Sequence, residues 1–82
     1  MKPPGLQEQF FNILRNTRTP VTFYLVNGFR MKGILEAFDA YSLMIRCGAD
    51  QELVFKHAVS TVIPAWPLQM NWQQGADEKS TQ

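Results

Sequence analysis

The chain has 82 residues, a formal net charge of +1 at neutral pH and a single cysteine, Cys47. This length allows one domain, and a domain this small buries only about 60% of the surface that its unfolded chain exposes, so a lone monomer would be marginally stable. One cysteine excludes a disulfide framework or a cysteine-based metal site within one chain. The nearly neutral charge means that any nucleic-acid binding must come from local clusters of basic and aromatic residues.

Residues 1–5 form a short N-terminal extension followed by Gln and Glu rather than by the apolar stretch of a secretory signal, so no signal peptide is expected. No run of 18 or more apolar residues occurs, so no transmembrane helix and no membrane partner are expected. A lone cysteine suits a reducing compartment. These features together predict a cytoplasmic protein.

Residues 6–18 are predicted to form a helix, which begins after Gly5 and ends before Pro20, because a residue that precedes proline is biased away from helical angles. Its apolar side chains recur at helical spacing and form one stripe, made of Leu6, Phe10, Ile13 and Leu14. Phe11 lies beside this stripe and is expected to be half exposed.

Five short strands are predicted after the helix, at residues 21–26, 29–38, 42–46, 52–56 and 61–63. Asn27-Gly28 favours a tight type I′ turn between the first two, which needs positive φ angles at both residues. Gly33 interrupts the alternation of the second strand and predicts a bulge or a sharp bend. The fifth strand follows the fourth almost directly, so it is expected to turn a corner. The fold class is therefore mainly β with one N-terminal α-helix, built on a five-stranded, strongly bent antiparallel sheet or small open barrel.

Catalysis is not expected. His57 is the only histidine and has no neighbouring metal ligand in the sequence, and no glycine-rich phosphate loop precedes a helix. The side chains that a nucleophilic triad would need are present in principle: Ser42 or Ser60, His57 and Asp39. Nothing around them resembles the strand-turn-helix motif that presents such a nucleophile. No enzymatic activity, cofactor, metal or small-molecule substrate is therefore predicted.

Three groups of residues could instead bind a ligand non-covalently. The first surrounds the Asn27-Gly28 turn and combines flat or soft side chains with cations: Tyr24, Phe29 and Met31 with Arg30 and Lys32. The second offers a stacking ring, a charge and an imidazole: Tyr41, Lys56 and His57. The third is a pair of arginines three residues apart on the helix, Arg15 and Arg18. Aromatic faces beside cations suit single-stranded nucleic acid.

Each group also has a purely structural interpretation, and the pattern alone leaves it open. Tyr24, Phe29 and Met31 could belong to the core. Lys56 could be a solvated charge at a strand end, and His57 a hydrogen-bonded structural residue. The arginine pair could be an ordinary solvated helix face.

Two segments resemble the two Sm motifs of the bacterial Hfq family of RNA chaperones. They are Tyr24-Leu25-Val26-Asn27-Gly28-Phe29 with Met31-Lys32-Gly33, and Phe55-Lys56-His57-Ala58-Val59-Ser60-Thr61. The second motif is highly specific, and the helix start, Leu6-Gln7 with Phe10 and Asn12, is also similar to the family. The resemblance covers about residues 5–64. The loop 48–51 and Phe29 with Met31 resemble the Gram-positive branch more closely.

The resemblance implies an Sm-like domain over residues 6–64 that assembles into a six-membered ring, in which strand four of one subunit pairs with strand five of the next. It implies single-stranded RNA as the partner, with small regulatory RNAs and mRNA brought together for pairing. It places uridine-rich RNA at the proximal pore, on Gln7, Tyr41, Lys56 and His57. It places adenine-rich RNA on the distal face, on Tyr24, Leu25, Gly28, Phe29, Arg30, Met31 and Lys32. It implies a rim site made of Asn12, Arg15, Arg18 and Phe38.

The sequence also departs from the family pattern. Ala40 stands where a glutamine or lysine often lies beside the proximal pocket, which removes one contact to a base edge. Asn16 and Thr17 interrupt a rim that can be more densely basic, so weaker annealing of two RNAs is expected. Phe55 replaces a frequent tyrosine and lacks its hydroxyl.

Residues 65–82 are expected to form a partly disordered tail, and its last ten residues are polar. Its large apolar residues occupy every second position, a strand-like spacing: Trp66, Leu68, Met70 and Trp72. Two interpretations remain open, an extension packed on its own ring or a contact with another ring or partner surface. For the whole chain, the alternatives to an RNA chaperone are a small barrel-type adaptor for protein or peptide, and an Sm-like ring that binds RNA without a role in small-RNA regulation.

Overall fold

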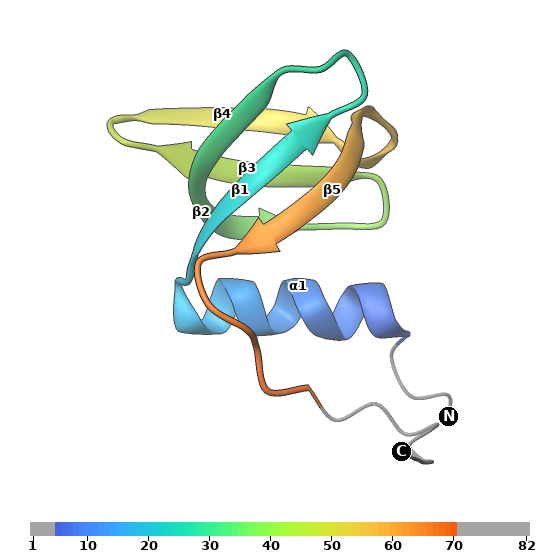
Figure 1. The fold of residues 1–82 in the computed structure, drawn as a ribbon, viewed down its shortest axis with the longest axis vertical. Coiled ribbons are helices and arrows are strands. Elements are labelled where there is room, and N and C mark those ends of the chain that lie inside the picture. Colours follow the sequence, from blue (N-terminus) through green and yellow to red (C-terminus); the bar gives the residue numbers. More distant parts are fainter. Residues whose placement is uncertain (1–4, 71–82) are drawn as a thin grey trace.

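A computed structural model of the chain describes residues 5–70 as one helix followed by five antiparallel strands (Figure 1). The elements are α1 (Leu6–Thr17), β1 (Pro20–Leu25), β2 (Arg30–Phe38), β3 (Ser42–Cys47), β4 (Asp50–Phe55), the 3₁₀ helix η1 (Lys56–Ala58) and β5 (Val59–Pro64). The strands form one sheet in the order β4-β3-β2-β1-β5. The predicted fold class is confirmed, with strand ends shifted by one to two residues. Within the described part, no helix is long and apolar enough to cross a membrane.

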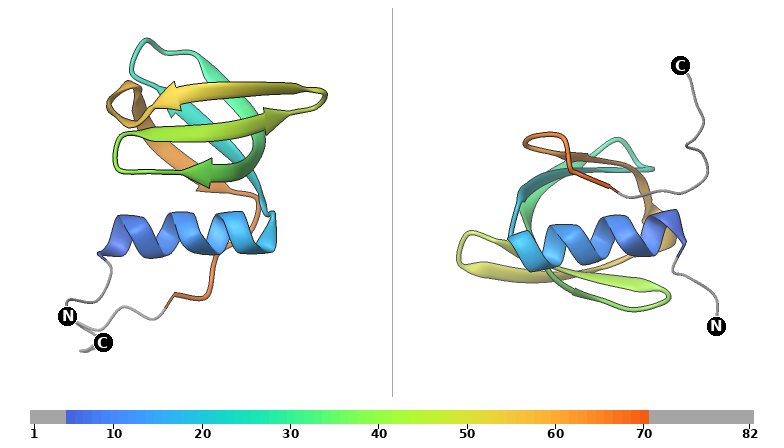
Figure 2. Two further views of the ribbon diagram at one scale, coloured as in Figure 1. Left: turned by 180° about the vertical axis from the view of Figure 1, so that it is seen from behind. Right: turned by 90° about the horizontal axis from the view of Figure 1, so that it is seen from below.

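The sheet is strongly curved, and α1 lies across one end of it (Figures 1 and 2). The core between them consists of seven buried apolar side chains: Phe11, Leu14, Val21, Phe23, Leu35, Leu43 and Ile45. They come from the helix and from three of the five strands. The helix therefore covers the end of the curved sheet that would otherwise be open. β4 and β5 occupy the two outer edges, and β5 turns the expected corner to pair with β1 rather than with β4.

The buried face of α1 differs from the predicted stripe. Phe11 is only 6% exposed, whereas Leu6 is 51% exposed, so the expectation that Phe11 is half exposed is wrong. The reason is tertiary, because the ring of Phe11 packs against that of Phe38 in β2, with 5.6 Å between their centroids. Leu14, one turn along, completes the buried face.

The β1–β2 hairpin uses a different turn from the expected type I′. Gly28 has a φ of 93°, but Asn27 does not have a positive φ. The N–H of Gly28 donates to the oxygen of Leu25 (3.0 Å), and the N–H of Leu25 donates to the oxygen of Phe29 (2.8 Å). This is a three-residue loop that ends in a left-handed glycine. The side-chain oxygen of Asn27 accepts the N–H of Phe29 (3.0 Å), so the asparagine acts through its side chain rather than its backbone.

Gly33 lies where β3 comes too close to β2 to leave room for a side chain. A Cβ at this position would overlap the backbone oxygen of Arg46 and lie 2.8 Å from Cγ2 of Ile45. The register shift between these strands lies elsewhere, between Leu35 and Ala37. The glycine therefore permits the sharp bend, and the bulge that the sequence placed at or near Gly33 occurs at Glu36.

Glu36, the extra residue of this bulge, ties three strands together. Its carboxylate accepts hydrogen bonds from Nε of Arg46 in β3 (2.9 Å) and from Nε2 of Gln51 in β4 (2.8 Å). These hydrogen bonds, first from Gln51 and then from Arg46, lower the pKa of Glu36 below its ordinary value. The bulge thus turns a carboxylate toward neighbours that an unbroken strand would not bring within its reach.

The segment after β5 runs past α1 without regular secondary structure as far as Met70 (Figure 1). Leu68 packs against the core cluster, and Phe10 and Met70 line a shallow hollow beside it. Trp66 is 55% exposed. This part of the tail therefore contacts its own subunit and does not form a strand. Trp72 and the polar end lie outside the described residues.

We predict that Gly33→Ala destabilises the fold strongly, because the added methyl meets a backbone oxygen that cannot move without displacing β3. The expected loss is at least about 2 kcal/mol in the free energy of unfolding, measured by urea denaturation. Gly5→Ala is the control, since a Cβ there meets no atom within 4 Å, and it should cost less than about 1 kcal/mol. Equal losses for both variants would contradict the role assigned to Gly33.

Candidate nucleic-acid interface

The corner between β4 and β5 fixes the position of Lys56 and His57. The N–H of Lys56 donates to the backbone oxygen of Tyr41 (2.7 Å), and the N–H of Val26 donates to the oxygen of Ala58 (2.8 Å). The backbone is therefore tied at both ends of η1, to the β2–β3 turn on one side and to the β1–β2 hairpin on the other. Both side chains of the pair project from this anchored corner.

Asp39 organises the turn that carries Tyr41. Its side-chain oxygen accepts the backbone N–H groups of Tyr41 (2.9 Å) and Ser42 (2.8 Å), and its own N–H donates to the oxygen of Ser42 (3.0 Å). These bonds, first that from Tyr41 and then that from Ser42, lower the pKa of the Asp39 carboxyl below its ordinary value. The ring of Tyr41 is 78% exposed, so the turn presents an aromatic face to solvent from a fixed backbone.

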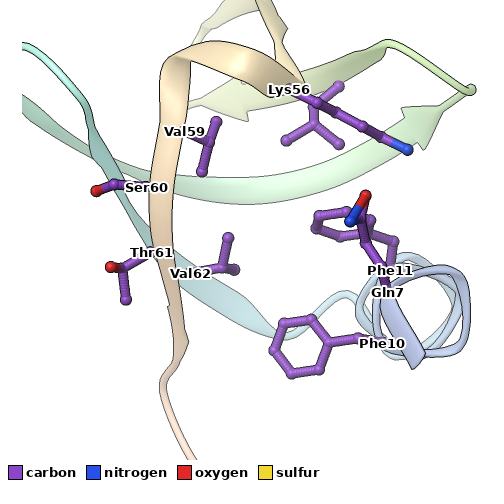
Figure 3. A pocket seen from close by; sticks show the side chains of 9 residues that line it. Gln7, Phe10, Phe11, Lys56, Val59, Ser60, Thr61 and Val62 are labelled. Atoms are coloured by element: carbon purple, nitrogen blue, oxygen red, sulfur yellow. The ribbon is translucent and has the colours of Figure 1, made fainter.

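Gln7, near the start of α1, and Lys56, in η1, face the same space between these two elements (Figure 3). Both residues line a hollow of about 250 Å³ whose floor is apolar. They also border a second hollow beside it, where Asp39, Ala40 and Glu8 form the wall. Ala40 offers this wall only a methyl group.

The four residues predicted to act together at the proximal site are thus brought to one corner of the molecule. Gln7 and Lys56 share the hollow, Tyr41 is joined to Lys56 through the backbone, and His57 follows Lys56 in η1. His57 is exposed, and its ring stacks on that of Phe55 with centroids 5.9 Å apart and planes 5° apart. The structure thus places the His57 ring at the surface, with one face covered by Phe55.

The predicted distal residues lie in different surroundings along the β1–β2 hairpin. Phe29 is 69% exposed at the hairpin tip, so it is not a core residue, and Tyr24 pairs with Arg30 directly beside it. Met31, in contrast, packs against the core cluster. Lys32 lies farther along β2, in a hollow that it shares with residues of β1 and β5. Leu25 and Gly28 form the hydrogen-bonded frame of the loop, described above.

The predicted rim residues form a contact group with one exception. The Asn12 side-chain oxygen accepts from Nη2 of Arg15 (2.9 Å), and the Arg15 guanidinium lies over the ring of Phe38, 5.3 Å from its centroid. Arg18 does not continue the helix face, because it is the C-cap in the left-handed conformation (φ 52°). Its charge acts instead on Glu36, whose pKa it helps to lower.

Sequence reasoning named two further residues of this region, Phe11 and Asp39, without finding the roles that the structure gives them. Phe11 lies under Lys56, whose Nζ is 5.4 Å from its ring centroid; its burial depends on the rotation of the helix, which the spacing of apolar residues did not reveal. The role of Asp39 could have been found, since an aspartate two residues before a turn amide is a common side-chain-capped turn.

A model of the family described as "Hfq protein" matches residues 6–69. The chain belongs to the Hfq family. It is 42% identical over 76 residues to the RNA-binding protein Hfq of Thermosipho africanus, covering 93% of this chain and 90% of that one. It is 39% identical over 78 residues to the RNA-binding protein Hfq of Moorella thermoacetica, covering 95% and 93%.

The fold gives the same answer. A crystal structure of the pleiotropic translational regulator Hfq matches with a TM-score of 0.71 and 34% identity, over 72% of this chain and 98% of that one. The resemblance inferred from the two Sm motifs is confirmed, as is the Sm-like fold. The region matched by the family model, residues 6–69, includes both motifs and ends within the segment that packs beside α1.

We predict that acid weakens this fold partly through Asp39. A carboxyl whose pKa is lowered in the folded state stabilises it fully above the unfolded-state pKa, which is about 3.9, and this stabilisation is lost as the pH falls through the lower folded-state value. Asp39→Asn keeps an oxygen acceptor for the two amides but cannot titrate. The free energy of unfolding of the natural chain should therefore fall more than that of Asp39→Asn between about pH 5 and pH 2. A difference between the two proteins that is independent of pH would contradict this role.

Proposed function

We propose that this chain is an RNA-binding chaperone that acts in the cytoplasm on small regulatory RNAs and mRNA and promotes their pairing. The observation that carries the proposal is the corner at which Gln7 and Lys56 share one hollow, with the exposed Tyr41 and His57 beside it. The family and the names of its relatives support RNA as the ligand.

The chemistry of this corner suits a uridine-rich strand. The Tyr41 ring offers a stacking face, which contributes about 1–3 kcal/mol per base. The Lys56 ammonium can bind a phosphate, and the Gln7 amide and the His57 imidazole can donate to or accept from a base edge. We therefore assign the proximal site to Gln7, Tyr41, Lys56 and His57.

The hairpin tip is the proposed site for adenine-rich RNA. Phe29 is the most exposed ring of this region, and Tyr24 lies across from Arg30 in the same ladder. An aromatic face next to a guanidinium can stack a purine while the cation neutralises the backbone. Met31 supports this surface from the core side, and Lys32 contributes charge farther along the strand.

The six-membered ring of the proposal comes from the family resemblance, and the edges of the sheet are compatible with it. β4 pairs only with β3, and β5 only with β1, so each described edge keeps a free row of backbone groups. Pairing of β4 with β5 of the next subunit would cover these edges and enlarge a core that is small for one chain. It would also place several copies of each weak RNA pocket along one bound RNA molecule, so that modest binding energies combine through high effective concentration.

The rim is the proposed place where two RNAs are brought together. Arg15, held by Asn12 and Phe38, supplies a fixed cation there. Asn16 binds the Nε of Arg15 (3.4 Å) rather than adding a charge of its own. Annealing driven from this rim is therefore expected to be weaker than from a rim with consecutive arginines.

We predict that two substitutions separate the two RNA sites. Lys56→Ala should weaken oligo-U binding about tenfold and leave oligo-A binding nearly unchanged. Phe29→Ala should weaken oligo-A binding at least about fivefold and spare oligo-U, because a stacking face is lost. Dissociation constants measured by fluorescence anisotropy at two salt concentrations check both results. Affinity should fall as salt rises, since RNA binding releases counterions.

The two variants serve as controls for each other, because each leaves the other site intact. Equal losses for both oligonucleotides in either variant would show that the sites are not separate. If the natural chain binds neither RNA at moderate salt, an adaptor for protein or peptide replaces the chaperone as the better reading of the exposed aromatic residues.

We predict a native mass of six subunits, the number that the family resemblance implies, with the two free sheet edges paired between neighbouring subunits. Native mass spectrometry and light scattering measure this directly. A monomer, or an assembly that does not close at six, would contradict the proposed ring.

Truncation after Ala65 adds a test of the tail. If residues 66–82 connect rings, the assembly size falls, and if they pack only on their own subunit, it is unchanged.

A further inference from the structure

Phe10 in α1 borders two hollows in the surface of the molecule. The first is the hollow of about 250 Å³ that Gln7 and Lys56 share, which we call the proximal hollow (Figure 3). The second is lined by Phe10 together with the segment after β5, including Leu68 and Met70. One side chain of the helix therefore borders both the proposed site for uridine-rich RNA and the first part of the tail.

The first turn of α1 is exposed. The helix begins at Gly5 without a side-chain cap, and residues 6–8 are all exposed to solvent. Phe10 is the first apolar side chain along the helix that packs against the core cluster. Gln7 lies beside Phe10 on the helix surface, since residues three apart are neighbours there. Helix ends open more readily than helix centres, so the contacts that hold Phe10 also determine how firmly Gln7 is held at the proximal hollow.

Residues 64–70 follow a defined course past α1 (Figure 1). The N–H of Ala65 donates to the backbone oxygen of Pro20 (2.9 Å), which ties the segment to the start of β1. Pro64 and Pro67 each restrict the backbone, because the proline ring fixes φ near −65°. Leu68 then packs against the core cluster. A segment that is tied at its start and stiffened by two prolines loses little further entropy when it packs beside the helix.

Two neighbouring large apolar side chains of this segment have different surroundings. Trp66 is 55% exposed, whereas Leu68 is partly buried against the core cluster and lines the hollow beside Phe10. The segment therefore contacts the helix and the core through Leu68 and not through the larger tryptophan. This difference supplies a matched pair of residues for a test.

We propose that residues 64–70 act as a strap that holds the start of α1 against the sheet, with Leu68 as a positioning residue for Gln7 at the proximal hollow. The inference rests on the proposed function and deepens it, because it gives the first part of the tail a role in binding uridine-rich RNA. A helix start that is ordered before RNA arrives loses less conformational entropy on binding, and the affinity for RNA is higher.

Two truncations test the strap. A chain that ends after Met70 keeps it, and a chain that ends after Ala65 loses it. The shorter chain should bind oligo-U about two- to fivefold more weakly, and the longer one within about twofold of the full chain. Oligo-A binding should change less than about twofold in both, because the residues proposed to bind it border neither hollow.

The comparison of the two truncations decides the outcome. Equal oligo-U affinities for the two truncated chains would overturn the inference, whether both match the full chain or both are already weakened. An equal loss of oligo-A and oligo-U binding in the shorter chain would also overturn it, since that result indicates a general loss of structure.

Point variants locate the effect within the strap. Leu68→Ala should weaken oligo-U binding by no more than Gln7→Ala does, and Trp66→Ala should leave it unchanged. In the Gln7→Ala background, Leu68→Ala should have almost no further effect, since the side chain that it positions is gone. If Leu68 contacted RNA itself, the two losses would be additive, and that result would overturn the inference.

A second readout needs no RNA. Hydrogen exchange of the backbone amides at the start of α1 should be faster in Leu68→Ala than in the natural chain and unchanged in Trp66→Ala, because only the leucine holds the helix. Equal exchange in all three proteins would overturn the strap.

Assembly mass and melting temperature show whether the variants are folded. If Leu68→Ala does not assemble, Leu68→Val, which removes less of the side chain, takes its place in the same cycle. Failure of the natural chain to bind oligo-U would overturn the proposed function and this inference with it. Oligo-U binding by the natural chain, with additive effects of Leu68→Ala and Gln7→Ala, would overturn this inference alone.

Discussion

The close approach of β3 to β2 at Gly33 is the constraint on which the rest of the molecule depends. Position 33 has no room for a side chain, and the contact lets β2 bend so that its two halves pair with different partners, β1 first and β3 afterwards. A flat sheet of five strands would expose both faces. The bent sheet encloses Phe23 and Leu35, and α1 covers its open end (Figure 2).

The same bend decides where the side chains of the candidate site lie. Because β5 pairs with β1 instead of β4, the chain must cross from one edge of the sheet to the other through η1. That crossing carries Lys56 and His57 past the turn of Tyr41 and the start of α1. The proximal corner is therefore a product of topology: residues far apart in sequence meet there because a bent sheet brings its two edges close to the same end of the helix.

Much of this could be predicted from the sequence. The order of elements followed from apolar periodicity and from turn residues, and the Lys56-His57 pair from a specific motif.

The errors came from contacts between elements that are distant in the sequence. The rotation of α1, which buries Phe11, depends on a ring in β2. The turn at Asn27-Gly28 has one left-handed residue rather than two, since the loop has three residues. Arg18 lies in the left-handed cap, where spacing along a regular helix no longer says which residues share a face. The contacts of Phe38 combine three elements, and no local pattern encodes them.

The two sheet edges have a further consequence for assembly. They are different surfaces, one from β4 and one from β5, so in the proposed assembly the contact between them would be heterologous, with β4 of one subunit against β5 of the next. Such a contact has no built-in end, and repeating it gives a closed circle only if the rotation from each subunit to the next divides a full turn, and otherwise an open filament. In such an assembly, the curvature of the sheet at Gly33 and Glu36 would contribute to that rotation. A change that merely relaxed the bend, without breaking any contact between subunits, could therefore alter how many of them close a circle.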